Sequence, residues 1–266
     1  MRLRLLGLAL LVLAPIVPAA PAAALSSDCL AMAGTEPRIL PAAYAETAVE
    51  ENQVRLTYLG HSSFLIESPG GIKIVTDYAG YYGATVPDVV TMNRAHRSHF
   101  TDTPDPAIRH VLRGWNPEGG PAQHDLAVGD VRIRNVTTDI RGGMMGRLPD
   151  GNSIFIFDVA GLCIGHLGHL HHELDAGRLA MIGRLDIVLV PVDGGYTMAQ
   201  ENMLEVLKAL KARVVIPMHV FGPTTLNRFI AVMGGDFTLQ TQTSPVLTIS
   251  AETLPDTPKL VVLPGY

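Results

Sequence analysis

Two short runs that contain only apolar residues, at 187–190 and 214–216, constrain the fold of this chain more than any other feature. Runs of this kind are typical of β-strands that are buried on both faces of a sheet covered by helices. Between them, residues 197–210 place apolar side chains on one face at helical spacing. The second half of the sequence therefore predicts alternating elements, with helices at 173–182, 197–210 and 226–233 and strands at 186–191 and 213–218.

The first half of the sequence is rich in strand signals instead. Short strand-like segments are separated by turn residues such as Pro69, Gly70 and Gly71, and residues 104–113 give only a weak helical signal. The predicted strands cover residues 54–59, 63–67, 72–76, 88–92, 131–138, 153–159 and 161–165. Two packed sheets with helices outside would accommodate both halves, so we predict a single α/β domain.

The first 24 residues have the three parts of a secretory signal peptide. Arg2 and Arg4 give a positive start, residues 5–17 form an apolar run, and Ala22 to Ala24 supply small residues for cleavage. A membrane-spanning helix needs about 20 apolar residues, so a permanent anchor is the weaker alternative. We therefore expect cleavage of residues 1–24 and a periplasmic or secreted protein.

The predicted mature chain consists of a lead-in at residues 25–52 and one domain at residues 53–266. Removing the two arginines of the signal takes the formal net charge from −5 to −7. This mild acidity argues against nucleic acid or an anionic membrane surface as a partner and leaves a small-molecule substrate as the expectation.

Two cysteines, Cys29 and Cys163, remain after the predicted cleavage. In an oxidising compartment they could pair and tie the lead-in to the domain. Cys163 lies in an apolar run, so it could equally be a buried free thiol. The sequence leaves both possibilities open.

The ten histidines are placed in a pattern that indicates a metal site. His96 and His99 follow one predicted strand, a group at residues 166–172 follows another, and His219 ends a third. Neutral imidazole is the commonest metal-binding side chain, and strand ends are positions from which a rigid sheet can direct ligands at one point. We therefore expect these histidines to converge.

Several motifs resemble, in order, those of the metallo-β-lactamase superfamily. They are residues 58–67 (YLGHSSFLIE), 74–77 (IVTD), 165–168 (GHLG), 191–197 (PVDGGYT) and 215–219 (VIPMH). The likeness is greatest to the lactonase-like branch, which includes ascorbate-6-phosphate lactonase, and it covers residues 54–222. It implies a four-layer αβ/βα sandwich and metal-dependent hydrolysis.

The chain departs from this family at the metal-binding signature. The family has His-x-His-x-Asp-His where this chain has Arg94-Ala95-His96-Arg97-Ser98-His99, and it has an aspartate where this chain has His169. The resemblance assigns His96 and His166 to one metal position, His99 and His219 to another, and His169 to both.

The loss of both carboxylates favours one divalent cation over two, because no anionic ligand offsets the repulsion between two cations. Zinc is the first choice for such a ligand set, with manganese or iron as alternatives. Imidazole ligands also suit copper and nickel.

Three polar residues lie at predicted strand ends beside this site. The resemblance implies that Asp77 orients neighbouring loops and ligands. Asn93 and Asp193 face the same region, although Asp193 could simply fix the turn at Gly194 and Gly195.

The missing aspartate leaves proton transfer to other residues. His61, His169 and His172 are the candidates, and Arg94 is a candidate for contacting an anionic part of the substrate. We predict an exported hydrolase that uses a metal-bound water on an ester, lactone, amide or phosphoester. The alternatives are a metal- or ligand-binding protein without hydrolysis, a redox enzyme with an iron or copper centre, and a decayed site of hydrogen-bonded histidines.

Overall fold

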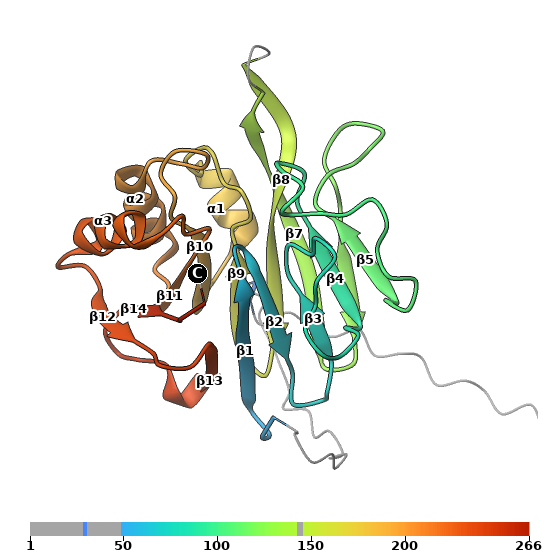
Figure 1. Ribbon diagram of the computed structural model, residues 1–266, viewed down its shortest axis with the longest axis horizontal. Helices are drawn as coiled ribbons and strands as arrows, with labels where there is room; N and C mark the ends of the chain where they lie inside the picture. Colours follow the sequence, from blue (N-terminus) through green and yellow to red (C-terminus); the bar gives the residue numbers. More distant parts are fainter. Residues whose placement is uncertain (1–28, 31–48, 143–145, 266) are drawn as a thin grey trace, which may run out of the picture.

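The computed structural model describes residues 29–30, 49–142 and 146–265. In these ranges the chain forms two β-sheets packed face to face, with helices beside one of them (Figure 1). The predicted signal peptide, residues 1–24, lies outside the described residues, as does most of the predicted lead-in. Export therefore stays a prediction.

The first sheet has six strands in the order β13-β1-β2-β3-β4-β5. These strands are β1 (Gln53–Gly60), β2 (Ser63–Glu67), β3 (Lys73–Val75), β4 (Val89–Met92), β5 (His110–Arg113) and β13 (Val246–Ser250). The pairs from β13 to β3 are antiparallel, whereas β4 joins β3 and β5 joins β4 in parallel. The four strands predicted between residues 54 and 92 are confirmed.

The second sheet has eight strands in the order β12-β14-β11-β10-β9-β8-β7-β6. These strands are β6 (Asp125–Val128), β7 (Val131–Arg141), β8 (Arg147–Val159), β9 (Leu162–His166), β10 (Ile187–Pro191), β11 (Val214–Met218), β12 (Thr238–Thr241) and β14 (Lys259–Val262). Strands β9, β10 and β11 run parallel, and every residue of β10 and β11 is buried. The two apolar runs are thus confirmed as strands covered on both faces.

Three α-helices accompany the second sheet: α1 (Ala176–Ile182), α2 (Gln200–Leu210) and α3 (Pro223–Met233), with a 3-10 turn at Ala251–Thr253. The predicted helices at 173–182 and 197–210 begin three residues later than expected. For α1 the reason is the Asp175 cap, whose side chain accepts from the backbone N–H of Arg178. No helix in the described ranges has the length and apolar character needed to cross a membrane.

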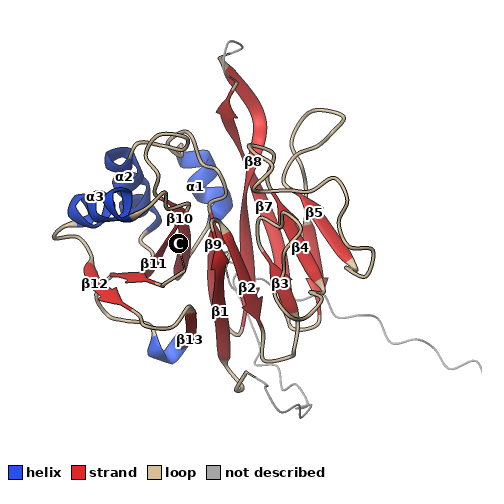
Figure 2. Ribbon diagram, in the orientation of Figure 1, coloured by secondary structure: helices blue, strands red, loops and turns tan. Residues whose placement is uncertain are grey.

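Three clusters of apolar side chains lie between or over the layers of the fold. Phe64 and Phe155 belong to the core between the two sheets, and Phe229 of α3 belongs to the core between the helices and the second sheet. The three helices gather on one side of the molecule (Figure 2). The outer face of the first sheet is covered, among the described residues, by the segments 76–88 and 93–109, which are not helical. The arrangement fits the predicted αβ/βα sandwich, with loops in place of helices over the first sheet.

The weak helical prediction for residues 104–113 is wrong. Residues 104–109 are irregular, and His110–Arg113 forms β5, which pairs in parallel with β4. Two prolines, Pro104 and Pro106, and the Asp105 side chain, which accepts from the Ala107 N–H, favour a turn over a helix.

Cys29 and Cys163 form a disulfide that joins residues 134 apart in the sequence. Both cysteines are buried in the core between the helices and the second sheet. The backbone carbonyl of Cys29 also accepts a hydrogen bond from the N–H of Arg184 at 3.1 Å. Of the two possibilities left by the sequence, the structure has the pair and not the free thiol.

Candidate metal centre

Ionisable side chains gather where strands of the two sheets end. In the second sheet, His219 follows β11 directly and Asp193 lies two residues after β10. In the first sheet, His61 lies between β1 and β2, and Asp77 lies two residues after β3. The rigid sheets thus direct side chains from distant parts of the sequence towards one place.

Four imidazoles, those of His61, His99, His169 and His219, form what we call the imidazole cluster. The ring centroid of His219 lies 4.3 Å from that of His61, 5.1 Å from that of His99 and 5.0 Å from that of His169. One ring nitrogen each of His61, His99 and His219 lie within 4.8 Å of one another. The cluster therefore gathers the type of atom that metal sites use.

Two aspartates fix the tautomers of two of these rings. The Nδ1–H of His99 donates to Oδ2 of Asp77 at 2.6 Å, and the Nδ1–H of His219 donates to Oδ1 of Asp193 at 2.9 Å. A carboxylate only accepts, so the proton of each neutral ring is on Nδ1 and the lone pair is on Nε2. Metal-binding histidines commonly donate their other N–H to a carboxylate in this way.

Both aspartates are ionised and so remain acceptors. Burial opposes the ionisation of Asp77, but the N–H groups of the nearby His166 and His99 rings, together with a hydrogen bond from Asn93, hold the pKa of this carboxyl below its usual value. Burial likewise opposes the ionisation of Asp193, but a hydrogen bond from His219 contributes to lowering its pKa. The predicted orienting role of Asp77 has this physical basis, and Asp193 both orients His219 and accepts from the backbone of the following turn.

Two of the four imidazoles, those of His61 and His169, are kept neutral by desolvation. Burial, reinforced by neighbouring rings, lowers the pKa of His61 to about 4 and that of His169 to about 2. The Nε2 atoms of His61, His99 and His169 are buried and have no hydrogen-bond partner in the described part of the chain. Leaving a buried polar group unpaired costs about 1–3 kcal/mol, so the cluster is arranged to bind something further.

The backbone at this site is held in an uncommon conformation. His61, Asp77 and His219 have φ angles of 53°, 44° and 57°, in the left-handed region. Such residues cost about 1–3 kcal/mol each and concentrate at functional sites. The carbonyl of His61 accepts from the N–H of His219 at 2.6 Å and from the hydroxyl of Tyr58 at 2.8 Å, which holds the two turns together.

His166, expected from the resemblance as a ligand, has both ring nitrogens engaged. Its Nδ1 accepts the N–H of Gly168 at 3.1 Å, so the ring proton is on Nε2, which lies 2.8 Å from the carbonyl of Ser62. No lone pair is left to bind a cation. These hydrogen bonds favour a structural role, in which His166 ties β9 to the turn after β1.

The remaining residues singled out in the sequence lie around the cluster. The ring of His96 is exposed at the edge, 4.8 Å from that of His169. His172 lies beyond His171, with 6.3 Å between the two rings, and Arg94 is exposed to solvent. The structure thus brings His99, His169 and His219 together, places His96 at the margin and leaves His172 outside.

His61 is the residue whose position the sequence reasoning understated. We expected it to move protons, whereas it belongs to the group of three whose nitrogens lie closest together. The usable signal in the sequence is the Gly60-His61 pair directly after a predicted strand, and in the structure both residues have positive φ angles, of 108° and 53°.

A cleft of about 270 Å³ opens beside the cluster. It is lined by His96, His171, Arg141 and Tyr196, together with Ala95, Ile140 and Gly195. The Arg141 guanidinium donates to the carbonyl of Tyr196 at 2.7 Å and to those of its two neighbours, which fixes this wall. Two exposed aromatic rings, Tyr196 and Phe221, lie 5.5 Å apart, and each contacts a histidine of the site.

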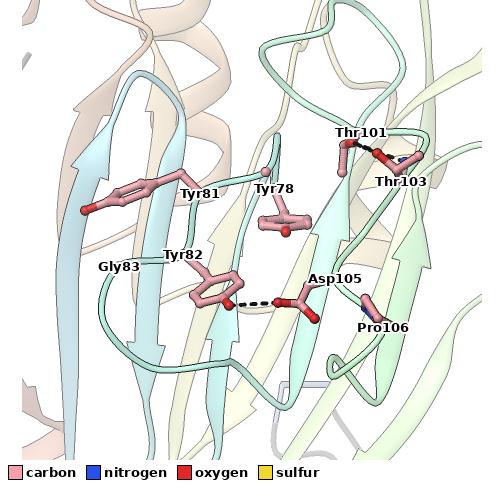
Figure 3. Close-up of a pocket in the computed structure, with 9 residues that line it drawn as sticks. Tyr78, Tyr81, Tyr82, Gly83, Thr101, Thr103, Asp105 and Pro106 are labelled. Carbon is pink, nitrogen blue, oxygen red and sulfur yellow. Dashed lines mark hydrogen bonds between the residues drawn. The ribbon is translucent and has the colours of Figure 1, made fainter.

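A second cavity, of about 610 Å³, lies among the loops that cover the outer face of the first sheet. Figure 3 shows Tyr78 and Tyr82 there, with the Tyr82 hydroxyl donating to the Asp105 carboxylate at 2.8 Å. No histidine is among the described residues that line it, so we place the candidate chemistry at the imidazole cluster.

Two buried asparagines hold the loops of the cluster at Gly168. Asn93 donates to Oδ1 of Asp77 at 2.9 Å and accepts the N–H of Ser153, while Asn152 accepts the N–H of His169 at 2.7 Å. A Cβ added at Gly168 would lie 2.4 Å from the Oδ1 of Asn152 and 2.4 Å from the Nδ2 of Asn93. Only glycine fits here.

Replacing Gly168 with alanine is therefore expected to lower the free energy of unfolding by about 1–3 kcal/mol, as overpacking does. Gly161→Ala is a matched control, because Gly161 also has a positive φ but its Cβ would meet nothing within 4 Å. Urea unfolding of both variants measures the difference. Equal losses would mean that the backbone angle, and not contact with the asparagines, explains the glycine.

The chain matches a family model described as a beta-lactamase superfamily domain over residues 55–219. With this match and the αβ/βα fold, the chain belongs to the metallo-β-lactamase superfamily. The closer likeness to ascorbate-6-phosphate lactonase stays a prediction.

Two relatives are similar to this chain over most of their own length. A protein of Opitutus terrae named UPF0173 metal-dependent hydrolase is 29% identical over 193 residues, which cover 62% of this chain and 84% of the relative. A protein of Methanosarcina barkeri with the same family name is 27% identical over 191 residues, covering 62% and 83%.

Two solved structures show the same fold. One, from Thermotoga maritima and described as a Zn-dependent hydrolase of this superfamily, has a TM-score of 0.58 and 26% identity, covering 79% of this chain and 98% of that one. The other, the metallo hydrolase Igni18 of Ignicoccus hospitalis, has a TM-score of 0.52 and 23% identity, covering 74% and 99%.

Proposed function

We propose that this chain is an exported metal-dependent hydrolase that acts on a small molecule beside the imidazole cluster. Its superfamily and the relatives named metal-dependent hydrolases support the reaction class. The Cys29–Cys163 disulfide supports export, because such bonds persist in oxidising compartments.

The observation that carries the proposal is the convergence of His61, His99 and His219, whose ligand atoms lie within 4.8 Å of one another. The Nδ1–H groups of His99 and His219 donate to aspartates, so the Nε2 atom of each ring carries the lone pair that is available to a cation. Three imidazoles with one open position form a known catalytic arrangement for zinc. Within the part of the chain that the structure describes, this is the one such group, which supports one cation, with zinc as the first choice and manganese or iron as alternatives.

When bound, a divalent cation would supply Lewis acidity that polarises the scissile group and lowers the pKa of water. Hydrolysis forms a bond from a water oxygen to the acyl carbon or phosphorus, breaks the bond to the leaving group and returns a proton to that group. His96 lines the cleft and is exposed to solvent, so it is placed to take a proton from the attacking water and to give one to the leaving group.

The residues at the cleft indicate which chemical groups a substrate could have. The exposed rings of Tyr196 and Phe221 offer an apolar surface at its rim, and an ester, lactone, amide or phosphoester with an apolar portion could pack on them. Arg94 is exposed and directly precedes Ala95 and His96 of the cleft, so it could contact an anionic portion.

Metal analysis of the full chain, purified from the periplasm without a histidine tag, tests the proposal. We expect about one zinc ion per chain. His99→Ala and His219→Ala should lose both zinc and hydrolysis. His110→Ala, which changes a histidine of β5, is the control and should lose neither. Hydrolysis is measured on a panel of esters, lactones, amides and phosphoesters before and after chelation. A chain without metal would support a binding protein instead, and bound iron or copper would support a redox centre.

A further inference from the structure

A chain of hydrogen bonds runs from the backbone of Arg141 into the imidazole cluster. The N–H of Arg141 donates to Nδ1 of His171 at 2.7 Å, and Nε2 of His171 lies 2.8 Å from Nδ1 of His169. The ring of His169 stands almost perpendicular to those of His99 and His219, with both centroids at 5.0 Å. Its Nε2 is buried without a partner among the described residues.

The direction of these bonds follows from one fixed donor. A backbone N–H can only donate, so Nδ1 of His171 carries a lone pair and the ring proton of His171 is on Nε2. That N–H must donate to Nδ1 of His169, which therefore also carries a lone pair. An imidazole has a proton on at least one nitrogen, so the proton of His169 is on Nε2. The reverse direction would leave His171 without any ring proton.

We infer that His169 presents an N–H, and not a lone pair, to the imidazole cluster, so that it donates a hydrogen bond to the substrate and does not ligate the cation. His171 is the positioning residue that fixes this tautomer. His169 is thus the opposite of His99 and His219, whose aspartate partners hold the proton on Nδ1. The inference relies on the proposed function for the cation, but the tautomer itself does not.

A donor at this point has a chemical use. Hydrolysis places negative charge on the oxygen of the attacked group, and a preorganised, buried N–H stabilises that charge strongly. The unpaired Nε2 of His169 offers such a donor. This donor role also explains why the imidazole of His169, at the position where the family has a carboxylate, does not act as a fourth ligand. The open coordination position of the cation therefore stays available.

The tautomer can be measured without any cation. Long-range proton–nitrogen correlation spectra of the full, metal-free chain with labelled histidines, assigned with His169→Gln, distinguish protonated from unprotonated ring nitrogens. We expect the protonated signal at Nε2 of His169 and the unprotonated one at Nδ1. The reverse pattern would overturn the inference, whatever the fate of the proposed function.

Zinc titration of the same chains gives a second readout. We expect His169→Gln to change zinc affinity by less than about tenfold, below the usual effect of an outer partner, whereas His99→Ala loses zinc. In His171→Glu the carboxylate can accept from both neighbours, which moves the His169 proton to Nδ1 and frees its Nε2 lone pair. Zinc should then bind about 10- to 100-fold more tightly, and His171→Gln, which can both donate and accept, should match the unchanged chain.

Loss of zinc in His169→Gln to the extent seen in His99→Ala, or no tightening in His171→Glu, would contradict the donor assignment. If even the unchanged chain binds no zinc, the proposed function fails, and the spectra alone decide the tautomer of His169. The two failures are therefore distinguishable.

Discussion

Replacing Asp77 with asparagine is expected to weaken zinc binding by about 100-fold, the upper range for an outer partner, and to remove most hydrolysis, while the chain stays folded. The effect should be large because the substitution reverses a hydrogen bond at a ligand. In place of a carboxylate that accepts the Nδ1–H of His99, an amide would stand against that nitrogen.

The amide cannot avoid this orientation. Oδ1 of Asn93 accepts the N–H of Ser153 at 2.8 Å, so its Nδ2 must face Asp77 and needs an acceptor there. In the variant, the oxygen of the introduced amide therefore takes the Asn93 side, and its NH₂ group is left facing Nδ1 of His99. His99 would respond by carrying its proton on Nε2, where the cation should bind.

Zinc titration and thermal unfolding of Asp77→Asn measure the two halves of this prediction. Asp105→Asn is a matched control, because Asp105 is a hydrogen-bonded carboxylate in the tyrosine-lined cavity, away from the imidazole cluster. Zinc affinity close to that of the unchanged chain would show that the Asp77 hydrogen bond does not set the His99 tautomer. A metal-free chain that no longer folds would show that Asp77 is needed for stability instead.

Strands β1–β4 and β7–β11 could be predicted from the sequence because their signals are local, whereas β5, β6, β12, β13 and β14 were not predicted. The runs in β10 and β11 contain nothing but apolar residues, and only a strand covered on both faces buries all of them. The segments that cover the first sheet could not be predicted, because their apolar residues do not recur at a regular spacing. Their packing depends on single contacts, such as that between the rings of Phe100 and Trp115 at 5.3 Å.

The candidate site likewise has features that could be predicted from the sequence and features that could not. That histidines at strand ends would converge followed from the topology, and His99, His169 and His219 do so. Which nitrogen of each ring is available depends on partners far away in the sequence. In His166 the N–H of Gly168 occupies Nδ1, so the ring proton is on Nε2, and the direction at His169 follows from hydrogen bonds that begin at the backbone N–H of Arg141. No spacing of residues encodes those directions.

Removal of the disulfide is expected to have the largest effect on stability. The bond closes a loop of 134 residues, and in the chain-entropy account the constraint on the unfolded chain grows with loop length. We expect Cys29→Ala with Cys163→Ala to lower the free energy of unfolding by about 2–5 kcal/mol. Guanidinium unfolding of the oxidised chain and of the double variant measures this difference.

Reduction of the disulfide in the unchanged chain distinguishes the contribution of the bond to stability from that of side-chain packing. Both sulfurs lie in the core beneath the helices, so alanine also removes buried volume. If the constraint dominates, the reduced chain should lose nearly as much stability as the double variant; if it loses almost nothing, packing of the two side chains explains the effect. Since the bond forms only under oxidising conditions, chain made in the cytosol should resemble the reduced form, whereas chain collected from the periplasm should carry the bond. Absence of the bond in chain collected from the periplasm would remove the main structural support for export.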